Sequence, residues 1–197
     1  MRTIELNVFN YEELSDSAKA KARDWYRQDD EGLHPDWDDF LQEDFKLIAN
    51  IFGIQNFNLM YSGFSCQGDG ACFTGEYTYQ TNMLARIKEE FPTSETLYDI
   101  AQRLFEVQRR NFFCVRVNIK HSGRYYHKYM TDFCIERDDG KYLAKESEKE
   151  IIEALRDLMG YFYNCLETSY WELVSDKSVE ESIINNEYEF YEDGSKF

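Results

Sequence analysis

The fold is decided by the stretch FFCVRVNIKHSGRYYHKYMTDFCI, residues 112–135. Apolar and polar residues alternate on both sides of a Ser-Gly turn, which is typical of two half-buried strands. A three-residue loop at 122–124 aligns three cross-strand pairs, Phe113–Phe133, Val117–Tyr129 and Ile119–His127. We prefer this register to a two-residue turn, because it places the apolar residues of both strands on one face. The stretch therefore predicts an antiparallel hairpin with strands at residues 112–119 and 125–135.

Further helix and strand patterns lie on both sides of the hairpin. Strands are expected near residues 4–8, 57–61, 72–79 and 187–191. Helices are expected from a cap at Asn10 or Ser15 to Asp29, from Pro35 to Gly53, and near 83–91, 95–108, 147–174 and 179–184. Short connections between consecutive strands favour an antiparallel sheet. We predict an α+β fold, with a mainly antiparallel sheet of about five to six strands and helices packed on one face. No long polar linker divides the chain, so residues 1–197 are expected to form a single α+β domain.

The composition excludes several classes of protein. The 197 residues include 22 Lys+Arg and 38 Asp+Glu, a formal net charge of −16, and 17% are aromatic. So many aromatic residues argue against a disordered chain, and the negative charge argues against direct, non-specific nucleic-acid binding. No apolar run approaches the roughly 18 residues of a membrane span, and the N-terminus does not resemble a signal peptide.

The cysteines and motifs point to no metal centre, cofactor or catalytic group. Five cysteines, an odd number without CxxC spacing, favour a reducing cytoplasm over a disulfide framework or a zinc site. The three histidines are dispersed, and no HExxH, P-loop, GxSxG or GxGxxG motif occurs. We therefore expect no metal, no cofactor and no catalytic residue, although the sequence does not decide whether the protein is an enzyme.

Charge is distributed unevenly along the chain. Residues 109–128 contain six Lys or Arg and no acid. In the register above, Arg116, Asn118 and Lys120 share a sheet face with Tyr126 and Lys128. This face is a candidate site for an anion, a nucleotide or an acidic partner, with Arg116, Lys120 and Lys128 as candidate ligand-binding residues. Alternatively, it packs against the protein's own acidic helices or forms a dimer contact.

The flanks of this basic segment are acidic. Residues 12–44 contain about twelve acids and residues 167–197 about nine. Acidic helices can imitate a phosphate backbone and occupy a nucleic-acid-binding groove; alternatively, they form an ordinary solvated surface. The candidate partner-binding residues are acids near the first two helices, namely Asp29, Asp30, Glu31, Asp36, Asp38, Asp39 and Glu43.

A glycine-rich loop at residues 62–73 is the most distinctive segment. Its three glycines permit close approach of a ligand to the backbone, and Ser65, Gln67 and Asp69 are candidate ligand-binding residues. A Cys66 nucleophile would need a neighbouring base such as His127. The favoured alternative to catalysis is a tight turn in which Gln67 and Asp69 bond to loop amides.

Three segments together resemble a known family: residues 11–23, the loop 62–71 and residues 184–194. This family consists of small phage and prophage proteins that are labelled as antitoxins of toxin–antitoxin stability systems. The resemblance spans most of the chain, and the loop is its most specific part. It implies a phage or mobile-element origin and a cytoplasmic setting, and it implies no catalytic residue.

Three functional hypotheses follow from the sequence. The first is a phage-encoded, non-enzymatic accessory protein in the host bacterial cytoplasm. It binds and inhibits a bacterial toxin or nucleic-acid-handling defence effector through its acidic surface, by nucleic-acid mimicry. The alternative is a small-ligand or nucleotide-binding protein, or an enzyme, that uses the Gly63–Asp69 loop and the basic hairpin face. A homodimeric scaffold without a ligand is the third.

Overall fold

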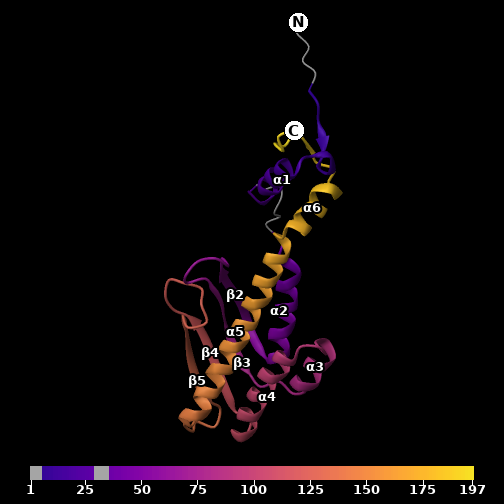
Figure 1. Cartoon of the computed structure of the whole chain (residues 1–197). Coiled ribbons are helices and arrows are strands. Elements are labelled where there is room, and N and C mark those ends of the chain that lie inside the picture. Colours follow the sequence, from indigo (N-terminus) through magenta and orange to yellow (C-terminus); the bar gives the residue numbers. More distant parts are fainter. Residues whose placement is uncertain (1–5, 29–35) are drawn as a thin grey trace. The chain divides into compact units, whose positions relative to one another are not determined.

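The computed structural model describes residues 6–28 and 36–197. The chain divides into two compact units (Figure 1). Unit 1 comprises residues 1–39 and 168–197, and unit 2 comprises residues 40–167. The expectation that the chain behaves as one domain stays a prediction.

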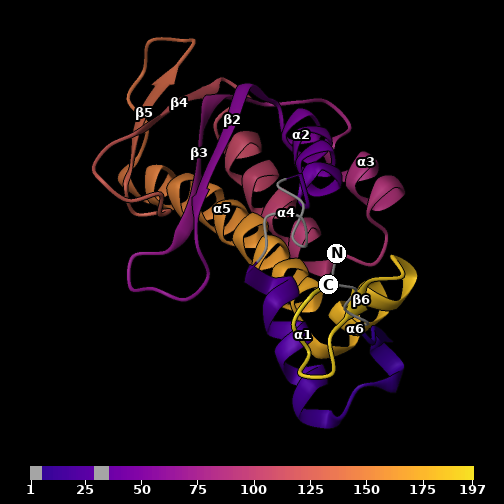
Figure 2. The same ribbon diagram turned by 90° about the horizontal axis from the view of Figure 1, so that it is seen from above.

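Unit 2 is built on a four-stranded antiparallel sheet in the order β2-β3-β4-β5. Its strands are β2 (Ile54–Ser62), β3 (Gly70–Thr78), β4 (Val115–His121) and β5 (Thr131–Arg137). Its helices are α2 (Asp39–Phe52), α3 (Met83–Glu90), α4 (Glu95–Arg110) and the greater part of α5 (Lys145–Leu173). Figure 2 shows α2, α4 and α5 along one side of the sheet. The predicted α+β fold class is therefore confirmed.

The core of unit 2 lies between the sheet and these helices. Phe162 of α5 is fully buried, and its ring centroid lies 4.5 Å from that of Phe45, 5.8 Å from that of Phe57 and 6.0 Å from that of Phe73. One aromatic side chain thus joins α2, β2, β3 and α5. The sequence spacing of α5 predicts a core stripe, namely Ile152, Leu155, Met159, Phe162, Leu166 and Leu173. The four middle residues of this stripe are buried, whereas Ile152 and Leu173 are half-buried and Ile151 is buried instead.

The β4–β5 hairpin forms, but the predicted register is wrong. Ile119 pairs with Phe133, six residues beyond the predicted partner His127, and Val117 pairs with Ile135. The connecting loop spans nine residues, 122–130, instead of three. Because side chains alternate with a period of two, an even shift keeps every residue of the two strands on its predicted face. The alternation of apolar and polar residues therefore does not distinguish the two registers.

Strand β4 begins at Val115, later than the predicted start at Phe112. Phe112 and Phe113 have φ angles of 57° and 58°, a left-handed conformation that a strand excludes. The fully buried side chain of Gln108 fixes the start of the strand. Its Nε2 donates to the Val115 carbonyl (2.8 Å), and its Oε1 accepts from the Val115 amide (3.2 Å).

Unit 1 contains the second sheet, in which β1 (Phe9–Asn10) pairs with β6 (Glu189–Phe190). It also contains the 3-10 helix η1 (Tyr11–Glu13), α1 (Asp16–Gln28), α6 (Asp176–Asn185) and the end of α5. Its buried core consists of Tyr11, Leu14, Ala18, Ala22, Tyr26, Val179, Ile183 and Phe190. Residues 6–8, which were expected to be part of the first strand, form none, and residues 4–5 lie outside the described residues. The exposed fractions of Leu6 (60%) and Val8 (37%) explain the error, because these side chains face no core.

Within residues 6–28 and 36–197, we find no helix with the length and apolar character of a membrane span.

Candidate functional site

The glycine-rich loop between β2 and β3 is organised by Asp69. The Asp69 carboxylate accepts hydrogen bonds from the amides of Ser65 (2.9 Å) and Cys66 (2.6 Å), and the Asp69 amide donates to the Cys66 carbonyl (3.1 Å). For Asp69 this confirms the tight turn expected as the alternative to catalysis. Ser65 and Gln67 are exposed. The carboxylate is thus engaged within its own loop, which argues against its use as a general base or a ligand-binding group.

This loop packs on helix α5. The hydroxyl of Tyr163 donates to the Gly63 carbonyl at 3.2 Å. The Phe64 ring lies 6.0 Å from that of Tyr61 and 5.7 Å from that of Tyr163. The loop is therefore anchored at its first glycine as well as at Asp69.

The later glycines of the loop make room for the β4–β5 loop, residues 122–130. A Cβ atom on Gly70 would lie 2.7 Å from His127 Cδ2 and 3.0 Å from the Tyr126 carbonyl. Gly68 has a φ angle of 101°, and a Cβ atom there would lie 3.3 Å from the Tyr125 ring. Figure 1 shows the two loops at the same end of the sheet. These glycines thus allow the glycine-rich loop to contact the β4–β5 loop closely.

The neighbouring Cys72 is buried beneath this contact. Burial raises the pKa of the Cys72 thiol to about 11, although a hydrogen bond with the His127 backbone opposes the shift. Such a thiol stays protonated at neutral pH and is a poor nucleophile. Cys66, in contrast, is exposed.

The β4–β5 loop is itself ordered by internal hydrogen bonds. The Ser122 amide donates to the Met130 carbonyl (2.8 Å), and the Met130 amide donates to the His127 carbonyl (2.7 Å). The Tyr129 amide donates to His127 Nδ1 (3.3 Å), so this ring nitrogen acts as an acceptor. From α5, Arg156 Nε donates to the Lys128 carbonyl at 3.3 Å. The nine residues therefore form a defined structure between the sheet and α5.

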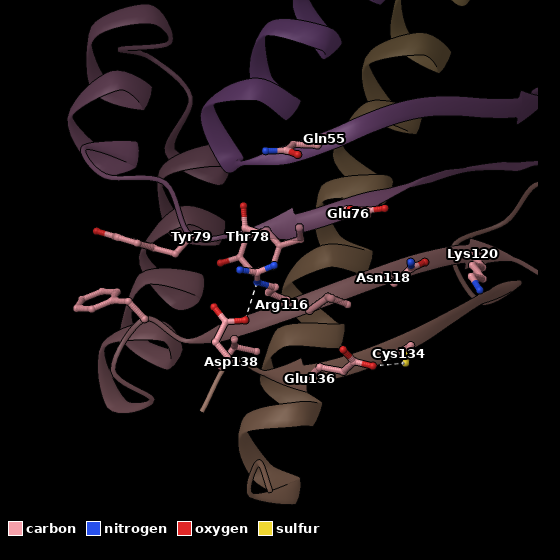
Figure 3. Close-up of a pocket in the computed structure, with 14 residues that line it drawn as sticks. Gln55, Glu76, Thr78, Tyr79, Arg116, Asn118, Lys120, Cys134, Glu136 and Asp138 are labelled. Atoms are coloured by element: carbon pink, nitrogen blue, oxygen red, sulfur yellow. Dashed lines mark hydrogen bonds and ion pairs between the residues drawn. The ribbon is translucent and has the colours of Figure 1, made fainter. Parts of the chain in front are cut away.

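The outer face of the sheet contains the other predicted cations. Figure 3 shows Arg116, Asn118 and Lys120 projecting from β4 into a hollow of about 700 Å³. The predicted basic face is wrong in its composition, because the true register places Glu136 opposite Arg116 and Asp132 opposite Lys120. Tyr126 and Lys128 belong to the β4–β5 loop instead.

Acidic groups balance the cations of this hollow. Arg116 Nε lies 2.7 Å from an Asp138 carboxylate oxygen, and Glu76 and Glu136 also line the walls. The lining includes none of the predicted Ser65, Gln67, Asp69 and Lys128. The six predicted ligand-binding residues are thus divided between the glycine loop, the β4–β5 loop and the outer sheet face, which weakens the case for one shared anion site.

The predicted partner-binding acids have different environments. Asp36, Asp39 and Glu43 are exposed, whereas Asp38 is only 8% exposed. Glu43 forms an ion pair with Lys46 at 2.6 Å. The remaining three, Asp29, Asp30 and Glu31, lie outside the described residues.

The two units differ strongly in charge when their residues are counted in the sequence. Unit 1 contains 7 Lys+Arg and 19 Asp+Glu, a formal net charge of −12. Unit 2 contains 15 Lys+Arg and 19 Asp+Glu, a formal net charge of −4. Three quarters of the net charge therefore belongs to the smaller unit.

Part of the acidic charge in unit 1 stabilises that unit. Lys21 pairs with Asp193 at 2.7 Å, Arg23 pairs with Glu180 at 2.7 Å, and Arg27 pairs with Asp176. The hydrogen bond from Lys21 lowers the pKa of Asp193 to about 2, and the hydrogen bond from Arg27 lowers the pKa of Asp176. Cations of α1 thus form ion pairs with acids of the C-terminal segment.

No cluster of metal-ligating side chains occurs in the described part of the chain. The surfaces that remain are an acidic unit 1, a mixed-charge hollow on the sheet and a basic, aromatic β4–β5 loop. These features define an α+β protein whose surfaces differ in charge.

The comparisons with known proteins identify a family. Residues 37–176 match a domain of unknown function, DUF8835, which covers more than half of the chain and all of unit 2. The protein therefore belongs to this family. No curated protein and no solved structure matches the chain.

The sequence contains a signal for the β4–β5 loop that the predicted register obscured. The run Arg124 to Tyr129 consists of basic residues and tyrosines without an acid. The predicted three-residue loop assigned Tyr125 to Tyr129 to a strand, where alternate residues would face the core. Six consecutive polar or amphipathic residues beside a Gly are better explained as a loop.

Proposed function

We propose that this protein is a phage-encoded, non-enzymatic accessory protein that binds a positively charged bacterial target through unit 1. The target class is a toxin or a nucleic-acid-handling defence effector. The carboxylates of unit 1 would occupy the groove that nucleic acid otherwise fills, since both are polyanions. The observation that carries the proposal is the partition of charge, with −12 of the total −16 in unit 1.

The exposed acids of unit 1 are available for such a target. Several make no ion pair with another described residue, and all of these are exposed: Glu12, Asp36, Asp39, Glu187, Glu189 and Glu192. Acids without an internal cation attract a basic surface at long range and raise its rate of association. The resemblance to phage antitoxin-like proteins supports a toxin or an effector as the target.

The experiment measures inhibition of purified bacterial toxin nucleases as salt rises from about 50 to about 500 mM. A polyanion that competes with nucleic acid is expected to lose more than about tenfold in affinity over this range. A variant with four neutralised acids in unit 1 is expected to bind its target at least about tenfold more weakly at low salt. This variant contains Asp36→Asn, Asp39→Asn, Glu189→Gln and Glu192→Gln.

The matched control neutralises the same number of exposed acids in unit 2, namely Glu89→Gln, Glu90→Gln, Glu95→Gln and Glu146→Gln. It changes the total charge equally, so we expect inhibition close to that of the wild type. Inhibition that does not change with salt concentration, or an equal loss of affinity in both variants, would exclude the mimicry mechanism.

A further inference from the structure

The β4–β5 loop presents exposed rings beside cations. Tyr125, Tyr126 and Tyr129 are 48%, 40% and 62% exposed. Residues 119–131 contain no Asp or Glu, while they contain five basic side chains, namely Lys120, His121, Arg124, His127 and Lys128. The formal charge of this segment is therefore opposite in sign to that of the whole chain.

Cations lie within contact range of two of these rings. The Arg124 guanidinium is 5.7 Å from the Tyr125 centroid, and Lys128 Nζ is 5.6 Å from the Tyr129 centroid. Arg156 of α5 lies 5.2 Å from the same Tyr129 centroid. A base stacked on either ring would bring its phosphate to a neighbouring cation, which is the arrangement that proteins use for single-stranded nucleic acid.

The loop is also preorganised for binding. A Cβ atom would lie 2.7 Å from His127 Cδ2 on Gly70 and 3.3 Å from the Tyr125 ring on Gly68, so both glycines leave room for the loop. The Arg156 hydrogen bond ties Lys128 to α5. Rings held in place before binding lose little conformational entropy when a ligand arrives. The glycine-rich loop thus helps to hold the β4–β5 loop in position.

We propose that the β4–β5 loop binds single-stranded nucleic acid. Bases stack on Tyr125, Tyr126 and Tyr129, and phosphates pair with Arg124, Lys128 and Arg156. This departs from the expectation of no direct nucleic-acid contact, which rested on the net charge of the whole chain; unit 2 has a net charge of only −4. The inference does not rest on the proposed function, which uses unit 1.

The test measures the fluorescence anisotropy of labelled oligothymidylate and oligouridylate of about 12 nucleotides with the full chain. The variant Lys128→Ala/Tyr129→Ala removes one cation and one ring from the loop. Its matched control, Lys141→Ala/Tyr142→Ala, makes the same two changes at a remote pair in which Tyr142 is fully exposed. We expect the loop variant to bind about tenfold more weakly or worse, and the control to bind like the wild type.

A single Arg124→Gln change provides a second variant, for the case that the double variant fails to fold. Arg124 is exposed and makes no hydrogen bond with another residue that the structure describes. The slope of log affinity against log salt is expected to fall in magnitude by about 0.7, the value for one phosphate contact on a single strand.

Competition distinguishes nucleic acid from an acidic protein partner. An abasic oligomer with the same phosphates, and polyglutamate of equal charge, are each expected to displace the oligonucleotide at least about tenfold less well than unlabelled oligothymidylate. Equal displacement by either competitor would overturn the proposal in favour of an acidic protein surface. Absence of binding to both oligonucleotides, or equal losses in the loop variant and its control, would overturn it as well.

Discussion

At the residue scale, Asp69 and Gly70 are adjacent, and both have structural roles. Asp69 closes its own loop through the amides of Ser65 and Cys66. Gly70 leaves room for the His127 side chain and the Tyr126 carbonyl. A polar residue beside glycines in a loop between strands is also the pattern of many ligand-binding loops. Only the bonds that Asp69 makes separate the structural role from the ligand-binding role.

We predict that Gly70→Ala lowers the free energy of unfolding by about 1–3 kcal/mol, because its Cβ atom would lie 2.7 Å from His127 Cδ2. The control is Gly160→Ala in helix α5, where the added Cβ atom meets only Lys128 Nζ at 3.5 Å. This control is expected to raise the free energy of unfolding by up to about 1 kcal/mol. Urea denaturation measures both variants, and a Gly70→Ala variant as stable as the wild type would contradict the loop contact.

At the element scale, the C-terminal turn after β6 depends on an ion pair. Lys21 of α1 donates to Asp193 at 2.7 Å, and the Ser195 amide donates to the same side chain at 3.0 Å. These contacts hold the pKa of Asp193 at about 2, below its ordinary value of 3.8. A carboxylate whose pKa is lower in the folded than in the unfolded state stabilises the fold above the unfolded pKa. That stability is lost as pH falls through the folded pKa.

We therefore predict a pH-dependent difference between the wild type and Asp193→Asn. The wild type is expected to be more stable above about pH 4, and the difference should shrink as pH falls toward about 2. Urea denaturation at each pH, followed by tryptophan fluorescence, measures it. The control is Glu192→Gln, since Glu192 is exposed and forms no ion pair with the described residues. A difference that persists unchanged at pH 2 would contradict the ion pair.

At the scale of the whole molecule, one helix belongs to both units. Helix α5 runs without interruption from Lys145 to Leu173, and the boundary between the units falls after Glu167. All three tryptophans, Trp25, Trp37 and Trp171, belong to unit 1. Tryptophan fluorescence therefore reports on unit 1 alone, whereas far-ultraviolet circular dichroism reports mainly on the helices and strands of the larger unit 2.

We predict that urea unfolds both units in one transition, with the same midpoint by fluorescence and by circular dichroism. The physical reason is that a continuous helix propagates cooperatively, so melting its end in one unit weakens it in the other. Coincident midpoints would support the single domain expected from the sequence. A separate, earlier fluorescence transition would show that unit 1 unfolds independently.

The sequence by itself determined the α+β class, the order of the elements and most of the helix boundaries. These features depend on local periodicity and on signals such as Gly53 at the end of α2, and such patterns are read within one element. Four of the six residues predicted for the apolar stripe of α5 are buried for the same reason. The alternation in β4 and β5 correctly predicted which residues of these strands face the core.

Only the tertiary structure decided the register of the hairpin, the partners of the charges and the role of the glycine loop. An even shift between two strands leaves the alternation of side chains unchanged, so sequence periodicity could not exclude the short loop. The shift moves Tyr126 and Lys128 off the sheet and places acids opposite Arg116 and Lys120. Charges and glycines take their roles from neighbours distant in the chain, such as Asp193 for Lys21 and His127 for Gly70. Such proximity arises only when the chain is folded.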